Sequence, residues 1–197
     1  MNKQARQVNI NDLLTLGTYS ANRKKIRKDL IELKKKRRIF LGPYATFYFE
    51  CYETILGQIQ EMLYVEKGGE EQLKDELTAY NPLIPKGKEL VATLMFEIDN
   101  PLSRTEFLNK IGGIENKIFI KINDEKINSV PEKDVNRTSP EGKASSVQFI
   151  HFNFQDQQIS KFKNLNNTVV IGMEHYLYNH KIKINDEIRK VLMNDFF

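Results

Sequence analysis

The sequence predicts an α+β fold, in which a mixed or antiparallel sheet packs against helices. Two kinds of apolar spacing alternate along the 197-residue chain. One repeats about every three to four residues, as in amphipathic helices, and the other about every two, as in half-buried strands. Helical spacing dominates residues 1–86 and strand spacing dominates 87–197. We therefore expect a single domain over 1–197, with a helix-rich front part and a sheet-rich back part.

The front part is expected to hold helices around one hairpin. The expected elements are a helix at about 19–36, strands at 37–41 and 45–50, a helix beginning at Tyr52, and a short helix that ends before Asn81-Pro82. Gly42-Pro43 separates the two strands and is typical of a hairpin turn. The helix beginning at Tyr52 has the clearest apolar stripe. Gly17 is expected to break the helical pattern before Tyr19.

The back part is expected to alternate strands and helices. The expected strands are 89–98, 117–122, a short one around Ile127, 147–154 and 168–173, and helices begin near Ser103, at Asp156 and at Asn185-Asp186. Ser103 and Glu106 have the spacing of a capping box, with Ser103 as the N-cap. The order over 89–173 is that of a split βαβ, ferredoxin-like (βαββαβ) motif. We therefore expect a ferredoxin-like sheet layer over 87–197, with His151 as a hydrogen-bonded core histidine.

Composition favours a reducing compartment. Cys51 is the only cysteine, so the chain can form neither an internal disulfide nor a zinc knuckle. No apolar run has the length of a signal peptide or of a membrane span. We expect a cytoplasmic protein with no membrane span.

Positive charge is concentrated in one segment. The net charge is +4, but residues 23–38 carry ten Lys or Arg and two acidic residues, so the rest of the chain sums to −4. The candidates for binding an anion or an acidic partner are Lys24, Arg27, Lys28, Lys35 and Arg38. Nucleic acid is the less favoured partner, because no aromatic residue that could stack on a base lies between Tyr19 and Phe40. The alternative is a helix face that contacts only water.

Two late histidines are the candidate metal ligands. His175 and His180 are five residues apart, so a turn must lie between them if both rings are to converge. With one or two of Glu50, Glu61 and Glu76 they would offer ligands suited to iron or zinc. The alternative is that both make ordinary hydrogen bonds. The sequence has no phosphate-binding loop, dinucleotide fingerprint or nucleophile elbow, so no complete catalytic motif identifies an enzyme.

Five segments carry a resemblance to a known family. They are Arg38-Ile-Phe-Leu-Gly-Pro43, Phe49-Glu50, Gln58-Ile-Gln-Glu-Met62, Ala79-Tyr-Asn-Pro-Leu-Ile-Pro85 and the Gly-x-Glu-His…Asn-His segment at 172–180. Together they resemble an uncharacterised bacterial family, the domain of unknown function numbered three-five-zero-one, over nearly the whole chain. The polar-site candidates that the resemblance implies are Glu50, Gln58, Gln60, Glu61, Glu66, Glu76, Tyr80 and Asn81, together with His175 and His180.

The resemblance also suggests a cellular context. Genes of that family tend to lie beside those of rubrerythrin-like proteins and iron–sulfur oxidoreductases. This implies an accessory role in redox or oxidative-stress chemistry through such a partner. The first alternative is a small metal-binding enzyme or metal carrier, and the second is nucleic-acid binding through the basic helix. We expect any site to lie where the Gln58–Glu61 helix, Tyr80-Asn81 and the His175–His180 segment meet.

Overall fold

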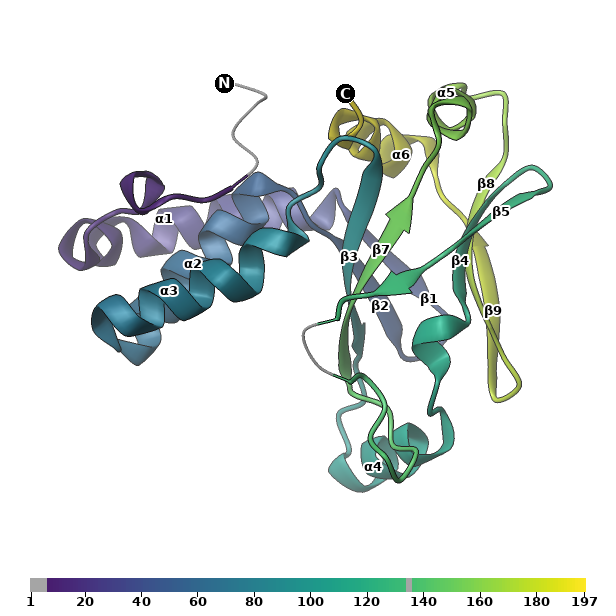
Figure 1. The fold of residues 1–197 in the computed structure, drawn as a ribbon, viewed down its shortest axis with the longest axis horizontal. Coiled ribbons are helices and arrows are strands. Elements are labelled where there is room, and N and C mark those ends of the chain that lie inside the picture. The colour runs from purple at the N-terminus through teal and green to yellow at the C-terminus, as the bar shows by residue number, and fades with distance from the viewer. Residues whose placement is uncertain (1–6, 134–135) are drawn as a thin grey trace.

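The computed structural model describes residues 7–133 and 136–197, and it contains two antiparallel sheets that face each other (Figure 1). The first sheet contains, in spatial order, β1 (Arg38–Leu41), β2 (Ala45–Phe49), β3 (Glu89–Phe96), β7 (Val147–Asn153) and β6 (Val130–Pro131). The second sheet contains β5 (Glu125–Asn128), β4 (Ile118–Ile122), β8 (Val169–His175) and β9 (Tyr178–Lys183). With the helices described below, the predicted α+β class is confirmed.

Helices cover the outside and the ends of this sandwich. They are α1 (Leu16–Lys35), α2 (Tyr52–Glu66), α3 (Gly69–Tyr80), α4 (Pro101–Lys110), α5 (Asp156–Lys163) and α6 (Asp186–Leu192), with short 3-10 turns at Ile10–Asp12, Asn81–Leu83, Ile114–Asn116 and Met193–Asp195. Across the described residues, none of these helices combines the length and the apolar content that crossing a membrane requires.

The main core lies between the two sheets. In β3, Leu90, Leu94 and Phe96 point into it, whereas Val91 is equally buried but belongs to a second apolar cluster on the other side. A strand that is covered on both faces must be apolar on both faces, which explains the run Leu-Val-Ala-Thr-Leu. Because β2 pairs with β3 in antiparallel register, the front and back parts of the chain share one sheet.

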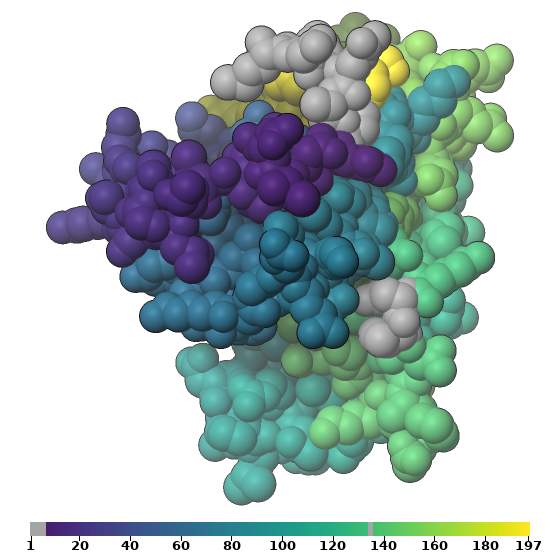
Figure 2. Space-filling view, turned by 60° about the vertical axis from the view of Figure 1, so that its left-hand side comes forward, coloured from purple at the N-terminus to yellow at the C-terminus, as the bar shows by residue number. Residues whose placement is uncertain are grey.

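The helical arm, formed by α1, α2 and α3, packs on the outer face of the first sheet. Its contact is the second apolar cluster, in which Ile55 and Ile59 of α2 meet Leu83 and Val91. The arm projects to one side of the sandwich (Figures 1 and 2). Tyr19 is the only buried residue of α1, so most of that helix is covered on one side by α2 alone.

The ferredoxin-like arrangement is wrong, although its order of elements along the chain is correct. In that motif all four strands share one sheet, but here β3 and β7 belong to the first sheet and β4 and β8 to the second. The connecting helices α4 and α5 lie at opposite ends of the sandwich (Figure 1). Each helix therefore connects one sheet to the other. In a split βαβ unit, by contrast, the helix would cover a face of a single sheet.

Three local predictions also change. Helix α1 begins at Leu16, so Gly17 lies within its first turn instead of breaking the pattern. Helix α4 is capped by Asn100, whose side chain accepts hydrogen bonds from the main-chain N–H groups of Leu102 and Ser103, so Ser103 is not the N-cap. Strand β9 was not predicted.

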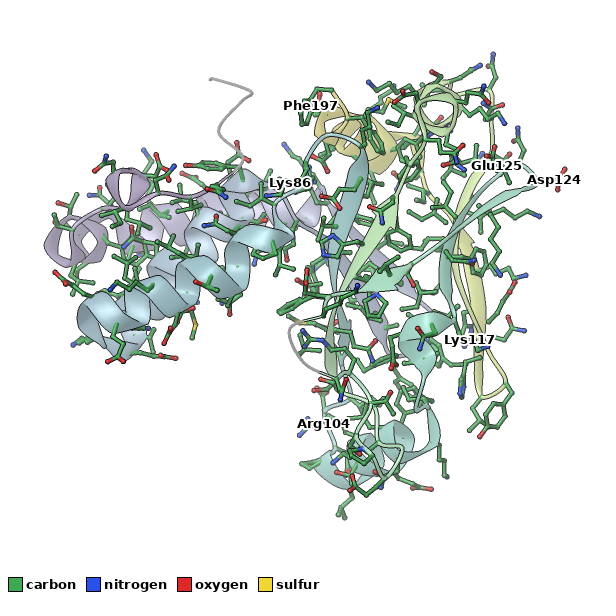
Figure 3. All side chains as sticks on the ribbon, in the orientation of Figure 1. Lys86, Arg104, Lys117, Asp124, Glu125 and Phe197 are labelled. Atoms are coloured by element: carbon green, nitrogen blue, oxygen red, sulfur yellow. The ribbon has the colours of Figure 1, made fainter. Side chains whose placement is uncertain are left out.

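Strand β9 is connected to the first sheet through Tyr178. Its hydroxyl accepts hydrogen bonds from the main-chain N–H groups of Tyr44 and Ala45, at 3.1 and 3.0 Å, and donates one to the carbonyl of Leu41, at 2.6 Å. A buried phenol with three partners joins the free edge of the second sheet to the β1–β2 turn. At the other end of the sandwich the main chain of Phe197 bonds to Gly87, beside Lys86 (Figure 3).

Candidate functional site

A cavity of about 320 Å³ lies between the helical arm and the outer face of the first sheet. We call it the pocket. Its polar lining residues are Lys34, Tyr48, Glu50, Gln58, Tyr80 and Thr93, and its apolar lining residues are Ile55, Leu83, Met95, Val147 and Phe149. The strands supply one wall and the ends of α1, α2 and α3 supply the other, so side chains distant in sequence converge in a space of small-molecule size.

Glu50 is the buried acid of the pocket. It lies directly between β2 and α2, and only 6% of its surface is exposed. The hydroxyl of Thr93 donates to one carboxylate oxygen at 2.6 Å, and the hydroxyl of Thr54 donates to the other at 2.5 Å. These two bonds hold the carboxylate in one orientation, and each oxygen retains a lone pair for a further donor.

Arg37 lies near this acid but is engaged elsewhere. Its guanidinium donates to the main-chain carbonyls of Phe49 and Glu50, both at 2.9 Å, and forms a buried ion pair with Asp195. The Glu50 carboxylate itself therefore contacts hydroxyl groups. In the part of the chain that the structure describes, no Lys or Arg side chain forms an ion pair with it.

Tyr80 and Gln58 form the wall opposite the sheet. Tyr80 ends α3, and its half-buried ring packs edge-to-face on Phe149 with the ring centroids 6.5 Å apart. Burial raises the pKa of the Tyr80 phenol, a hydrogen bond with Gln58 works against this, and the carboxylates of Glu76, Glu66 and Glu50 raise the pKa further. The phenol is therefore held in its neutral form, as a hydrogen-bond donor and acceptor facing the pocket.

Two of the predicted polar residues anchor the N-terminal segment and do not line the pocket. The side-chain amide of Gln60 pairs with the main-chain N–H and carbonyl of Leu14, at 2.7 and 3.2 Å. The amide of Asn81 does the same for Val8, at 2.7 and 3.1 Å. Each amide replaces a strand-like pair of main-chain bonds, which is a structural role.

Two of the predicted carboxylates bond within the helical arm. Glu61 accepts hydrogen bonds from Tyr19 at 2.6 Å and from Arg23 at 2.5 and 3.1 Å. The hydrogen bond from Arg23 lowers the pKa of Glu61 to about 2, against the effect of burial. Glu76 is buried and accepts a hydrogen bond from Gln72 at 3.2 Å.

The two late histidines lie on the β8–β9 hairpin, on the far side of the sandwich from the helical arm (Figure 1). His180 packs on the ring of Tyr178 and over Gly42, where a Cβ atom would lie 2.6 Å from the imidazole. His175 is buried, and its Nδ1 accepts a hydrogen bond from the N–H of Leu177 at 3.3 Å. The predicted meeting of this segment with Gln58 and Tyr80 is therefore wrong.

The donors proposed for a metal do not come together. Glu50 and Glu61 lie with the helical arm, and the histidines lie on the opposite sheet. Within residues 7–133 and 136–197, no three His, Cys, Asp or Glu side chains are grouped so that they could share a metal ion. These residues do not fit iron or zinc.

The basic candidates are spread over two elements. Lys24, Arg27, Lys28 and Lys35 are exposed on α1, whereas Arg38 lies on β1 and stacks on Phe40 with its guanidinium carbon 4.6 Å from the ring centroid. Lys35 forms an ion pair with Glu32 at 2.7 Å, and Arg27 lies 3.6 Å from Glu61. Lys24 and Lys28 have no ion pair within the described residues and face water.

His151 forms a second polar cluster, outside the pocket. It lies on the outer face of β7, with Nδ1 3.0 Å from Glu89 and Nε2 2.8 Å from Glu132. Its hydrogen bonds are satisfied, as predicted, but it lies outside the main core. Burial by itself lowers the pKa of His151, and the two carboxylates outweigh this effect, so that the pKa is raised above its usual 6.5.

This cluster predicts that protonation of His151 stabilises the fold. The stabilisation is fully present below about pH 6.5, the unfolded value, and is lost as the pH rises through the higher pKa of the folded protein. We expect NMR titration to give a His151 pKa above 6.5, and Glu132→Gln to bring it down by removing one carboxylate. Exposed Glu141→Gln is the control. A His151 pKa at or below 6.5 in the unaltered protein would contradict this.

Several pocket residues were not recognised in the sequence. Thr93 is a polar residue in an apolar strand, and Phe149 is an outward-facing aromatic residue in another. Each of the two residues departs from the pattern of a strand that is apolar on one face and polar on the other, and this departure is visible in the sequence. The sequence places Lys34 in the basic segment, and nothing in its spacing indicates that it lines a cavity.

A family model and a solved structure each match nearly the whole chain, and both are described as being of unknown function. The model of a family described as protein of unknown function (DUF3501) matches residues 7–196. A crystal structure described as a novel protein of unknown function from Burkholderia pseudomallei K96243 is 32% identical, with a TM-score of 0.89, and the match covers 97% of this chain and 100% of that one. No curated protein matches the sequence.

Proposed function

This chain belongs to the DUF3501 family, and from that premise we propose that it is a binding protein for a small organic amine, which it holds in the pocket. The family description assigns no activity, so the proposal rests on the pocket itself. The observation that carries it is the burial of the Glu50 carboxylate between two hydroxyl groups. A carboxylate that is almost fully buried normally has a cation in contact, because removing a charge from water is costly.

Here the contacts of Glu50 are two hydroxyl groups. Arg37, a buried cation near it, already forms an ion pair with Asp195 and donates to main-chain carbonyls. The carboxylate oxygens thus have unused lone pairs at the lining of a cavity. An ammonium group entering the pocket would form charge-assisted hydrogen bonds with these oxygens.

The rest of the lining fits the remainder of such a molecule. Tyr48 and Tyr80 line the pocket with aromatic rings, a type of group that attracts cations. The ring of Phe149 already has the Arg137 guanidinium over it, 4.7 Å from the ring centroid. Ile55, Leu83 and Met95 offer apolar surface to a hydrocarbon chain or ring. The ligand class supported best is therefore an amine with an apolar body.

Calorimetric titration with n-hexylamine tests this proposal. We expect binding by n-hexylamine and none by hexanol, which has the same chain without the charge. Glu50→Gln should weaken the binding about tenfold or more, because a hydrogen bond to a charged group contributes roughly 1.5–3 kcal/mol. Glu53→Gln, an exposed change one turn away, is the matched control. Absence of amine binding, or equal affinity in Glu50→Gln, would sink the proposal.

An accessory role beside an iron–sulfur oxidoreductase or a rubrerythrin-like protein remains a second proposal. It is supported by the exposed Lys24 and Lys28 of α1, which could meet an acidic partner surface. Association with a purified protein of either class should weaken with salt and be lost in Lys24→Glu/Lys28→Glu. Association that is unaffected by salt and by the two charge reversals would count against this second proposal. Cytoplasmic location stays a prediction.

A further inference from the structure

A second cavity, of about 190 Å³, adjoins the pocket. We call it the groove. It lies between α1 and α2, and Lys34 and Gln58 line both cavities. The pocket and the groove are therefore neighbouring parts of one cleft, divided by these two side chains. A flexible molecule that extends past these two side chains would reach from the pocket into the groove.

The two parts of the cleft differ in charge, and Lys34 lies at the border between them. Among the described residues, Glu61 is the one carboxylate that lines the groove, and it is already bonded to Arg23 and Tyr19. Arg27 lies 3.6 Å from the same carboxylate, with about half of its side chain exposed. Arg23 and Arg27 both lie against this carboxylate, and Lys34 also lines the groove, so positive groups outnumber negative ones there. In the pocket, the Glu50 carboxylate accepts hydrogen bonds from hydroxyl groups, and Lys34 lies at the border with the groove.

We propose that the cleft binds one elongated zwitterion, an amino acid whose ammonium group contacts Glu50 in the pocket and whose carboxylate contacts Arg27 and Lys34 in the groove. This inference rests on the amine-binding function proposed above. The apolar chain between the two charged groups lies against Ile55 and Leu30, which line the pocket and the groove respectively. Charges of both signs make the cleft selective for a molecule with both groups at a set separation.

The test compares ω-amino acids of four to eight carbons with n-alkylamines of the same chain length, by calorimetric titration. At the best length the amino acid should bind about tenfold more tightly than the matched amine, from the added charge attraction. That affinity ratio should fall with added salt, because the groove is partly open to water.

Variants of groove residues test whether the groove is responsible for the higher affinity of the amino acid relative to the matched amine. In Arg27→Gln and in Lys34→Met the ratio should fall toward one. In Lys25→Gln, an exposed change on the same helix, the ratio should be unchanged. If amines bind but no amino acid binds more tightly, or if the ratio survives both variants, the zwitterion inference is overturned and the amine-binding proposal stands. If no amine binds, both are overturned.

Discussion

Replacing Arg189 by methionine is expected to lower the free energy of unfolding by roughly 3–5 kcal/mol. The Arg189 side chain is completely buried. It donates to the main-chain carbonyls of Phe162, Asn167 and Asn164 at 2.7, 2.6 and 2.7 Å, and to that of Lys161 at 3.2 Å. These carbonyls belong to the last turn of α5 and the loop after it, where a helix leaves acceptors without partners.

One guanidinium therefore closes the end of α5 and fixes it to α6. Methionine fills much of the space but donates nothing, so several acceptors would lose their partners at once. Urea unfolding followed by circular dichroism measures the loss. Lys190→Met, the exposed neighbour on α6, should change stability by less than about 0.5 kcal/mol. A loss below about 1 kcal/mol in Arg189→Met would show that water replaces the guanidinium at these carbonyls.

Removing the carboxylate of Asp195 should be about as costly, again roughly 3–5 kcal/mol. Asp195 and Arg37 form an ion pair whose side chains are 7% and 4% exposed. The pair joins the last turn of the chain to the start of β1, beside Glu50. Asp195→Ala would leave the Arg37 guanidinium buried without this partner, and the loss of one charge from a buried pair costs more than the pair itself contributes.

A double-mutant cycle separates these effects. Arg37→Met/Asp195→Leu should be clearly more stable than the summed losses of Arg37→Met and Asp195→Leu predict, because neither charge is then left alone. Glu187→Ala, at an exposed position of α6, is the control for removing an acidic residue near the C-terminus. Additive losses in the cycle would mean that the two side chains act independently.

Local pattern was enough to predict most elements of this protein. The hairpin around Gly42-Pro43, the helix beginning at Tyr52 and the strand beginning at Glu89 all appear as expected. Each depends on the spacing of apolar residues and on turn residues a few positions away. Strand β9 was not recognised because Asn179, Lys181 and Lys183 give it the polar composition of an exposed edge strand.

The assignment of strands to sheets was decided only in three dimensions. Strands β3 and β8 have similar apolar sequences, and nothing local distinguishes the sheet that each one joins. The sheet that each strand joins depends on the paths of α4 and α5, which connect the two sheets at opposite ends of the sandwich (Figure 1). It separated the late histidines from the helical arm and left His180 packed over Gly42.

By itself, the sequence determined the α+β class, the hairpin, the main helices, and the polar character of Glu50, Gln58 and Tyr80. The tertiary structure decided that these three side chains line one pocket with Thr93 and Lys34, and that Gln60 and Asn81 instead anchor the N-terminal segment. The physical reason is the separation along the sequence between the residues that contact one another. Helices and strands follow from neighbours in sequence, whereas a pocket depends on contacts between residues tens of positions apart, which local spacing does not record.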